Sequence, residues 1–224
     1  MARARPRALI AWSSGKDSAW ALHRVRTEGE YEIVGALTTV AEHTDRVSMH
    51  GVREELLRAQ LEASRLPATV VRIPSPCPND VYEARMSAAM EQAKAARVTH
   101  VVFGDLFLED IRAYREAQLA RAGITALFPL WRLPTDLLAR DMINSGLKAK
   151  LVSVDLVKLP MEFAGRDFDG ELLGALPAGV DPCGENGEFH TFACAGPMFE
   201  SEIPVRSGET VARDGFAYSD LLAA

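Results

Sequence analysis

The stretch Ala8-Leu9-Ile10-Ala11-Trp12-Ser13-Ser14-Gly15-Lys16-Asp17-Ser18 decides how the rest of the chain is interpreted. Its apolar run predicts a buried strand over residues 7–12, and the helical spacing that begins at Ala19 predicts a helix over 19–26. The polar residues between them form a tight turn from strand to helix. Unpaired N–H groups at a helix start bind anions, small residues let a phosphate approach the backbone, and Lys16 adds positive charge. The turn is therefore typical of a polyphosphate site.

Residue spacing excludes two familiar phosphate loops. A Walker A loop needs glycine, four residues and then Gly-Lys-Ser/Thr, but Lys16 is followed by Asp17, and Ile10 stands where the first glycine belongs. The dinucleotide fingerprint Gly-x-Gly-x-x-Gly is absent. The hexapeptide resembles the pyrophosphate-binding loop of ATP pyrophosphatases, Ser-Gly-Gly-x-Asp-Ser/Thr, with Ser14 in place of the usual glycine. A capping box, in which Ser14 caps the helix and Asp17 reaches back, stays open beside it.

Composition predicts an ordinary globular protein of one to two domains. Of the 224 residues, 48% are hydrophobic and 25% are charged; the net charge is −6 and the pI about 5.4. An acidic chain argues against general nucleic-acid binding. No apolar run has the length of a membrane span, and Cys77, Cys183 and Cys194 lack the spacing of a zinc site or disulfide framework. We expect a cytoplasmic protein, and the sequence leaves a homo-oligomer open.

Strand and helix patterns alternate as far as residue 128. Further strands are predicted at 31–40, 69–73, 99–103 and 126–128, and helices at 51–65, 81–97 and 109–122. Strands separated by helices imply a parallel sheet with right-handed crossovers. The fold class is therefore α/β, with a parallel five-stranded sheet and helices on both faces. The segment Pro129–Pro134 breaks the rhythm, which predicts a first domain over 1–130 and a smaller α+β domain over 131–224.

The second half is richer in loops. We expect a helix over 136–145 capped by Thr135, a strand over 150–158, and a short helix over 168–176. Further strands are expected at 189–193, 203–206 and 209–213, with Ser207-Gly208 as the turn between the last two.

The run Asp181–Thr191 holds the second unusual pattern. Asn186-Gly187 is a strong turn signal, and Glu185 and Glu188 flank it. On an extended strand Glu188 and His190 share a face. Two carboxylates and an imidazole beside a turn can bind Mg²⁺, hold an ammonium-like nucleophile, or act as acid and base. A solvated hairpin with ordinary surface charges is the alternative.

Together these motifs make the chain similar to the diphthine–ammonia ligase family, a branch of the ATP pyrophosphatase superfamily. The matching segments are 13–18, Gly104-Asp105 with 112–116, and 184–191. The resemblance implies a HUP-like first domain of the N type that binds ATP, and a second domain that takes the acyl acceptor. It also implies an AMP-forming amidation, in which ammonia is joined to the carboxylate of diphthine, a modified histidine of translation elongation factor 2. Asn186 stands where eukaryotic members usually have glycine, which indicates a subgroup whose acceptor can differ.

The resemblance assigns a role to each matching residue. The residues expected to bind the phosphates are Ser13, Ser14, Gly15, Lys16 and Ser18, and those expected to bind Mg²⁺ are Asp17 and Asp105. Adenine is assigned to the strand edge at Leu37 and Thr38, and a further nucleotide contact to His50. At the crevice edge, Gly104 and Asp105 are assigned to the nucleotide, with Asp105 as a metal or ribose ligand. Arg112 and Arg115 are assigned to neutralising the phosphates as pyrophosphate leaves. The catalytic set is Lys16, Asp17, Glu185, Glu188 and His190. Plain structural roles stay open for several of these: a buried strand end for Leu37 and Thr38, a solvent-exposed loop position for His50, and a helix-surface pair for Arg112 with Glu116.

Two other functions fit parts of the sequence. A tRNA-modifying ATP pyrophosphatase would need a basic surface and usually paired cysteines, which the pI and the cysteine spacing oppose. A non-catalytic sensor of ATP or AMP would leave Glu185 and Glu188 without a purpose. The favoured expectation is an enzyme that adenylates the carboxylate of an acceptor, either a small molecule or a modified protein side chain, with ATP and Mg²⁺.

Overall fold

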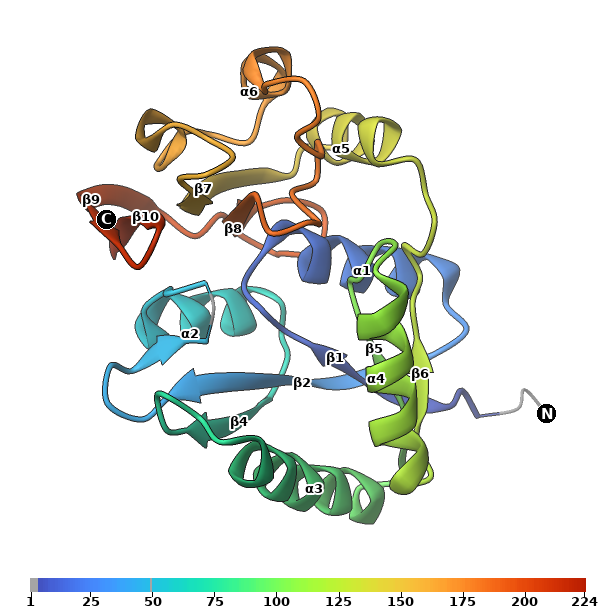
Figure 1. Ribbon diagram of the computed structural model, residues 1–224. Coiled ribbons are helices and arrows are strands. Elements are labelled where there is room, and N and C mark those ends of the chain that lie inside the picture. The colour runs from blue at the N-terminus through green and yellow to red at the C-terminus, as the bar shows by residue number, and fades with distance from the viewer. Residues whose placement is uncertain (1–3, 49) are drawn as a thin grey trace.

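The computed structural model describes residues 4–48 and 50–224, and its first half alternates strands with helices (Figure 1). The elements are β1 (Arg7–Ala11), α1 (Lys16–Glu28), β2 (Glu32–Ala41), β3 (Arg46–Val47), α2 (Glu54–Ala63), β4 (Ala68–Ile73), α3 (Asn79–Ala95), β5 (Val98–Val102), α4 (Glu109–Arg121) and β6 (Thr125–Leu127). The expected strands and helices of this half all form. Strand β3 is an addition, because two residues are too few to show a period.

Five of these strands run parallel in the order β4-β2-β1-β5-β6, and β3 pairs antiparallel with the end of β2. The expected five-stranded parallel sheet is confirmed, with one short antiparallel strand added. The chain winds outward from β1 to β4 on one side and from β5 to β6 on the other. The direction of winding thus reverses between β1 and β5, and such a reversal opens a crevice at the carboxyl ends of the strands. The loops that follow β1 and β5 flank this crevice.

Strand β1 is buried on both faces, which explains its continuous apolar run. Ala8 and Ile10 belong to the apolar cluster that includes α1 and α2, whereas Leu9 belongs to the cluster that includes α3 and α4. Figure 1 shows α1 and α2 on the side of the sheet that faces the C-terminal half, and α3 on the opposite side. The expectation of helices on both faces is confirmed.

The second half builds a separate antiparallel sheet in the order β8-β7-β10-β9. Its elements are α5 (Thr135–Asn144), β7 (Lys148–Asp155), a short 3₁₀ helix (Met161–Phe163), α6 (Gly170–Ala175), β8 (Phe189–Ala195), β9 (Val205–Arg213) and β10 (Phe216–Ala223). Strand β8 is an edge strand, and it lies beside α1 (Figure 1). The β8 edge of this sheet therefore faces the first half of the chain.

Two local expectations for this half are wrong, and one strand was not expected. Thr135 lies inside α5, whose N-cap is Pro134. Ser207-Gly208 is not a turn, because β9 runs through it and Ser207 pairs with Leu221. The turn lies instead at Asp214-Gly215, with φ values of 51° and 81°, and it leads into β10, which the sequence analysis missed. A two-residue Asp-Gly loop is a strong hairpin signal, because both positions accept positive φ.

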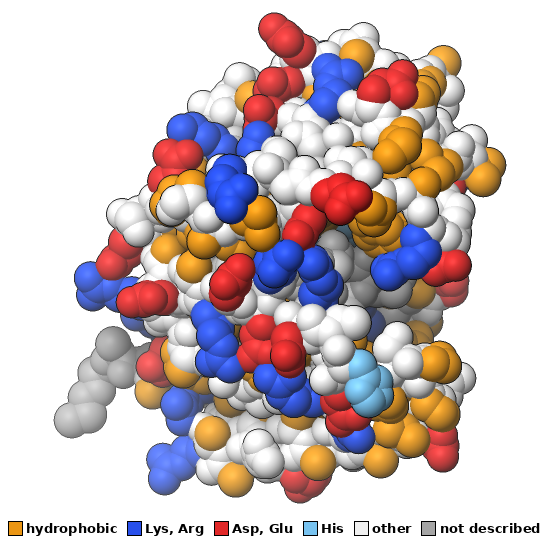
Figure 2. All heavy atoms as spheres, turned by 90° about the vertical axis from the view of Figure 1, so that its left-hand side faces the viewer, with side chains coloured by type: hydrophobic (Ala, Val, Ile, Leu, Met, Phe, Trp, Pro, Cys, Tyr) orange, Lys and Arg blue, Asp and Glu red, His pale blue; other side chains and the backbone are white. Residues whose placement is uncertain are grey.

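Charges of both signs are mixed over the surface. On the face shown in Figure 2, Lys and Arg side chains stand beside Asp and Glu. Ion pairs such as Arg72 with Asp45, at 2.7 Å, illustrate this pairing. Within residues 4–48 and 50–224, no helix combines the length and the apolar character that a membrane crossing requires.

Candidate active site

The turn between β1 and α1 is closed by its own serines. Ser13 Oγ lies 3.2 Å from Ser18 Oγ, and the Ser18 hydroxyl donates to the Gly15 carbonyl at 3.0 Å. Helix α1 begins at Lys16 with Gly15 as N-cap, and no side chain of the cap residue bonds to the helix. The capping-box interpretation is therefore wrong. The turn keeps small side chains where the crevice of the sheet opens.

Ser14 stands in the left-handed region of backbone space, with φ of 72°. Glycine adopts this conformation freely, whereas another L-residue is strained by about 1–2 kcal/mol, which explains why the usual loop has glycine here. The Ser14 side chain is fully buried, and its hydroxyl meets no partner within the described part of the chain. Its carbonyl, in contrast, accepts from Ala193 N at 2.9 Å and from Gln60 Nε2 at 3.0 Å. The strained backbone thus points a carbonyl at the second sheet.

The edge of β8 docks directly on this turn. Thr191 and Ala193 alternate along the strand and turn their backbone groups away from β7. The Ala193 amide reaches Ser14, and the Thr191 carbonyl lies 3.0 Å from His50 Nδ1. The Thr191 hydroxyl accepts from the Lys16 amide at 3.0 Å and so caps α1 from the other half of the chain. An edge strand with unpaired backbone groups is normally a liability, and here the phosphate-loop region covers it.

Gln60 links α2 to the serine turn and to β8, and it was not among the residues expected at the site. Its side chain is fully buried on α2; Oε1 accepts from Trp12 Nε1 at 3.0 Å, and Nε2 donates to Ser14 and to Ala193, the latter at 2.6 Å. A signal was present. Gln60 falls on the apolar face of α2 beside Leu57 and Leu61, and a polar residue in such a stripe needs buried partners.

Lys16 points away from solvent. Its side chain is 2% exposed, and Nζ donates to the Cys183 carbonyl and to Asp17 Oδ2, at 2.9 Å in the second case. Burial by itself would lower the pKa of Lys16, but the attraction of Asp17, with further help from Cys183 and Glu185, raises this pKa overall. The structure thus brings Lys16 against the second motif, with its charge retained.

Glu185 faces the loop after β5. Its Oε1 accepts from Leu106 N at 2.7 Å and from Phe107 N at 3.4 Å. Burial raises the pKa of Glu185 to about 7, and the nearby carboxylates of Asp17 and Asp105 add to the rise. A carboxyl group with a pKa near neutrality can both take up and release a proton at physiological pH.

Glu188 and His190 do not share the environment of Glu185. Glu188 is 2% exposed, and its Oε1 accepts from Asp181 N at 3.2 Å and from Asn186 Nδ2 at 3.1 Å, within its own turn. The ring of His190 lies 4.7 Å from that of His50, tilted by 34°. The two carboxylates and the imidazole therefore have different partners. Glu188 lies in the turn before β8, which begins at Phe189, whereas His190 is the second residue of the strand.

The end of β5 packs closely on the start of α1. A Cβ added to Gly104 would lie 2.7 Å from the Asp17 carbonyl carbon and 2.8 Å from Ser18 N, so only glycine fits. Asp105, at 12% side-chain exposure, pairs with Arg115 at 2.9 Å. The crevice edge predicted for Gly104-Asp105 thus lies next to the serine turn.

Arg112 and Arg115 have different surroundings. Arg115 covers the Phe103 ring at 4.5 Å in addition to pairing with Asp105. The Arg112 guanidinium contacts the rings of Phe128 and Trp131, 4.9 and 4.7 Å from their centroids, and donates to Glu116 at 2.8 Å. The helix pair of Arg112 with Glu116 that stayed open in the sequence is present.

The remaining nucleotide candidates lie around the same loop. The Leu37 carbonyl accepts from Trp12 N at 2.8 Å, and the buried Thr38 hydroxyl finds no partner among the described residues. His50 is half-buried rather than solvent-exposed, and its ring approaches Gly15 so closely that a Cβ there would lie 2.7 Å from Cε1. Burial, then His190 and Lys16, lower the pKa of His50 to about 3; burial and Lys16 lower that of His190 to about 4. Both rings are neutral at physiological pH.

Metal ligands are sparse in this arrangement. In the described ranges, no group of three or more His, Cys, Asp and Glu side chains is placed to hold a metal ion. Asp17 nevertheless keeps a buried oxygen, Oδ1, that has no partner in the part of the chain that the structure describes. Mg²⁺ is commonly bound by one or two carboxylates together with substrate phosphates, and Asp17 and Asp105 fit that limited role.

The cysteines do not form a reactive pair. All three are free, and Cys183 and Cys194 are buried. Burial raises the pKa of both thiols, which keeps them protonated. Thiolate is the reactive form of cysteine, so these two lack the property that sulfur transfer requires.

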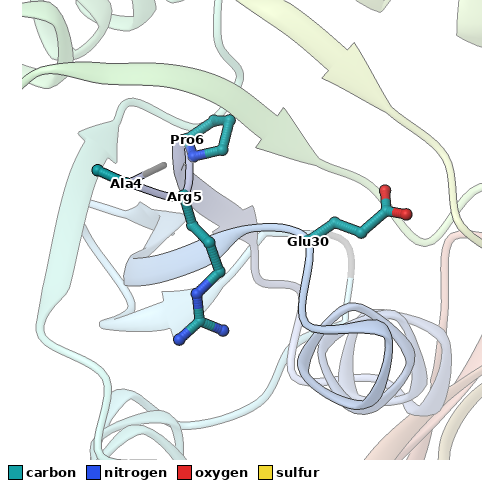
Figure 3. A pocket seen from close by; sticks show the side chains of 4 residues that line it. All are labelled: Ala4, Arg5, Pro6 and Glu30. Atoms are coloured by element: carbon teal, nitrogen blue, oxygen red, sulfur yellow. The ribbon is translucent and has the colours of Figure 1, made fainter. Parts of the chain in front are cut away.

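A hollow near the N-terminus lies away from this site. Figure 3 shows its lining, Ala4, Arg5, Pro6 and Glu30. These residues precede β1 and β2, so the hollow lies at the amino ends of the strands. Ligands in open α/β sheets bind at the carboxyl ends, which favours the serine turn over this hollow.

Comparison with known proteins covers nearly the whole chain. Residues 6–125 match the family model described as diphthamide synthase N-terminal domain, and residues 134–221 match diphthamide synthase C-terminal domain. A diphthine–ammonia ligase of Danio rerio is 28% identical, over 92% of this chain and 89% of its own length. The Mus musculus relative of the same name is 26% identical, over 96% of this chain and 88% of its own. The Homo sapiens relative is 32% identical over a shorter stretch, 44% of this chain and 39% of its own.

Proposed function

Since the chain belongs to the diphthamide synthase family, we propose that it is a cytoplasmic ATP-dependent amide ligase that forms AMP and diphosphate. The observation that carries the proposal is the direct contact of its two motifs. The Lys16 amide donates to the Thr191 hydroxyl at 3.0 Å, and beside it the Ser14 carbonyl accepts from Ala193 N, two residues beyond the second motif, at 2.9 Å. A ligase must bring an activated acid and a nucleophile together, and this contact places the nucleotide loop against the second motif.

The nucleotide end of the site has the donors that a triphosphate needs. The Ser13 and Ser18 hydroxyls lie 3.2 Å apart, and the N–H groups at the start of α1 carry the positive end of the helix dipole. Gly104 lets the end of β5 pack directly against the start of α1, which would hold these donors in place. Thr38 lies within β2, its buried hydroxyl has no partner among the described residues, and this part of the strand would receive the base. Asp17 and Asp105 would hold Mg²⁺, which supplies positive charge to the leaving diphosphate.

The chemical steps need few groups from the protein. The acceptor carboxylate oxygen attacks the α-phosphorus of ATP and diphosphate leaves; ammonia then attacks the acyl carbon and AMP leaves. Such transfers depend on positioning and charge neutralisation more than on covalent help. Arg115, next to Asp105, is the cation best placed at the crevice edge. Arg112 lies against two adjacent aromatic rings and has a structural role in this proposal.

Glu185 would act as the base for the nitrogen nucleophile. Ammonium must lose a proton before its nitrogen can attack, and the pKa of Glu185, raised to about 7 by burial, suits that transfer. Glu188 would keep the turn in shape through Asp181 and Asn186. His190 would stack on His50 and close the site beside Gly15.

The two halves would divide the reaction between them. Residues 1–130 would bind and activate ATP, and residues 131–224 would present the acceptor. The names of the relatives give diphthine as their acceptor. For this chain we propose an acceptor with a carboxylate of that kind, on a small molecule or a modified protein side chain.

Product analysis tests the proposal. The pure protein is incubated with ATP and Mg²⁺, with and without ammonium and a diphthine-bearing protein. AMP and diphosphate that depend on both additions support the ligase. ADP and phosphate would contradict it, and tight ATP binding without any product would favour a nucleotide sensor. Product formation that depends on added tRNA would favour the tRNA-modifying alternative.

A further inference from the structure

The Lys16 ammonium makes most of its contacts with the second half of the chain. The side chain is 2% exposed, and Nζ donates to the Cys183 carbonyl as well as to Asp17 Oδ2. An ammonium group buried without partners is strongly unfavourable. The orientation of the Lys16 side chain is therefore fixed by the groups that bond to Nζ. Cys183 lies 167 residues from Lys16 in the sequence, so this hydrogen bond links the phosphate loop to the second half of the chain.

Two aromatic rings complete the surroundings of this ammonium. Nζ lies 5.4 Å from the ring centroid of Phe168 and 5.4 Å from that of Phe189. Both rings are about 2% exposed, and both belong to the second half. A cation held over aromatic faces away from water is stabilised by the ring quadrupoles. Asp17 is thus the one partner of Nζ in this set that comes from the first half.

The turn that Lys16 grips is the one that carries Glu185. Gly184 follows Cys183 in the left-handed region, with φ of 71°. The Glu185 amide then donates to Asp181 Oδ2 at 2.9 Å, and its carboxylate accepts from Leu106 N at 2.7 Å. The turn is therefore anchored from two sides, by Lys16 at Cys183 and by the loop after β5 at Glu185.

We infer that Lys16 is a positioning residue, which holds the Cys183–Glu185 turn over the nucleotide loop, and that it is not a ligand of the phosphates. The inference rests on the proposed function, since it assigns Lys16 to the placement of the base Glu185. The hydroxyls and amides of the serine turn bind the triphosphate. Lys16 binds the turn of the second half, so the loop that receives ATP also sets the geometry of the acceptor side.

The test separates nucleotide binding from turnover. Lys16→Met keeps the length of the side chain and removes its charge, and Lys94→Met on the exposed face of α3 is the matched control. Affinity for α,β-methylene-ATP is measured by calorimetry, and kcat is measured by AMP release. We expect K16M to bind the analogue within about threefold of wild type and to lose about 100-fold in kcat, as a misplaced catalytic group does.

The pH profile provides a readout that a general loss of packing would not move. In wild type, kcat should follow an ionisation near the Glu185 pKa of about 7. In K16M this ionisation should shift, because the turn that buries Glu185 is released. A fall of about 10–100-fold in affinity for the analogue would overturn the inference, since that is the loss expected for a charged phosphate contact. An unchanged kcat would overturn it as well.

A second variant covers the case in which K16M does not fold. Phe168→Leu leaves Lys16 in place but removes one of its aromatic faces from the second half. The expected result is a lower kcat with unchanged affinity for the analogue, and wild-type kcat in F168L would overturn the inference. Failure of the proposed function itself is distinguishable, because the wild-type protein would then release no AMP although it binds the analogue.

Discussion

Gln60 provides the sharpest test of how the two halves are joined. In Gln60→Met the side chain keeps nearly the same volume but loses all three hydrogen bonds. The Ser14 carbonyl retains its bond from Ala193 N, whereas the Trp12 indole N–H and the Ala193 carbonyl lose their partners. Trp12 is 2% exposed and Ala193 is fully buried, so water cannot replace the lost bonds.

The cost follows from these two orphaned groups. A buried polar group without a partner costs about 1–3 kcal/mol, so the free energy of unfolding should fall by about 3 kcal/mol or more. For a chain of this length, that corresponds to a fall of roughly 6–12 °C in Tm. Thermal unfolding followed by circular dichroism measures it, and Gln92→Met on the exposed side of α3 is the control. If Q60M and Q92M had the same Tm, the buried hydrogen bonds of Gln60 would not stabilise the contact between the two halves.

Three further predictions concern the loop and its surroundings. Ser14→Gly should raise the free energy of unfolding by about 1 kcal/mol because it removes the strain of a positive φ; equal or lower stability in chemical denaturation would contradict this. Gly104→Ala should weaken binding of α,β-methylene-ATP about tenfold or more, since its Cβ displaces the start of α1; unchanged calorimetric affinity would show that the helix start does not hold the nucleotide. The low pKa values of His50 and His190, about 3 and about 4, make the unfolded chain bind more protons below the ordinary pKa of about 6.5. The free energy of unfolding should therefore be constant above about pH 6.5 and decrease as the pH drops towards 4. Denaturation curves at several pH values should show a smaller decrease for His50→Gln than for wild type. The same decrease in both proteins would argue against the burial of this ring.

Much of the first half could be predicted because its signals are local. The apolar run before the serine turn, with helical spacing after it, led to β1 and α1, and Gly104-Asp105 fell at the end of β5 as expected. The winding order follows from short right-handed crossovers. The serine turn and the second motif could be singled out because residue types at fixed spacing carry their chemistry.

The contacts between the halves could not be predicted in the same way. No period or motif links Lys16 to Cys183 or Thr191 to α1, because these contacts depend on how two sheets pack. Thr135 was assigned as a cap from local preference, although the helix already includes it. Gln60 had a readable signal, a polar residue on an apolar helix face, but its partners lie on two other elements and come only from the fold.

The turn at Asp214-Gly215 was missed for a different reason. Ser207-Gly208 and Asp214-Gly215 both carry turn residues, and only one of them can end β9. The β9–β10 pairing shifts register between Ser219 and Leu221, opposite Ser207-Gly208, and β9 therefore continues through these two residues. Tertiary pairing, rather than local preference, therefore decided which signal became the hairpin.

The location of bound nucleotide tests the central claim most directly. A crystal structure of the wild-type protein with α,β-methylene-ATP should show its β- and γ-phosphates within hydrogen-bond distance of the Ser13 and Ser18 hydroxyls, with the α-phosphate facing the turn that bears Glu185. Nucleotide bound at another surface, with the serine turn still packed on β8 and in contact with no phosphate, would contradict the account.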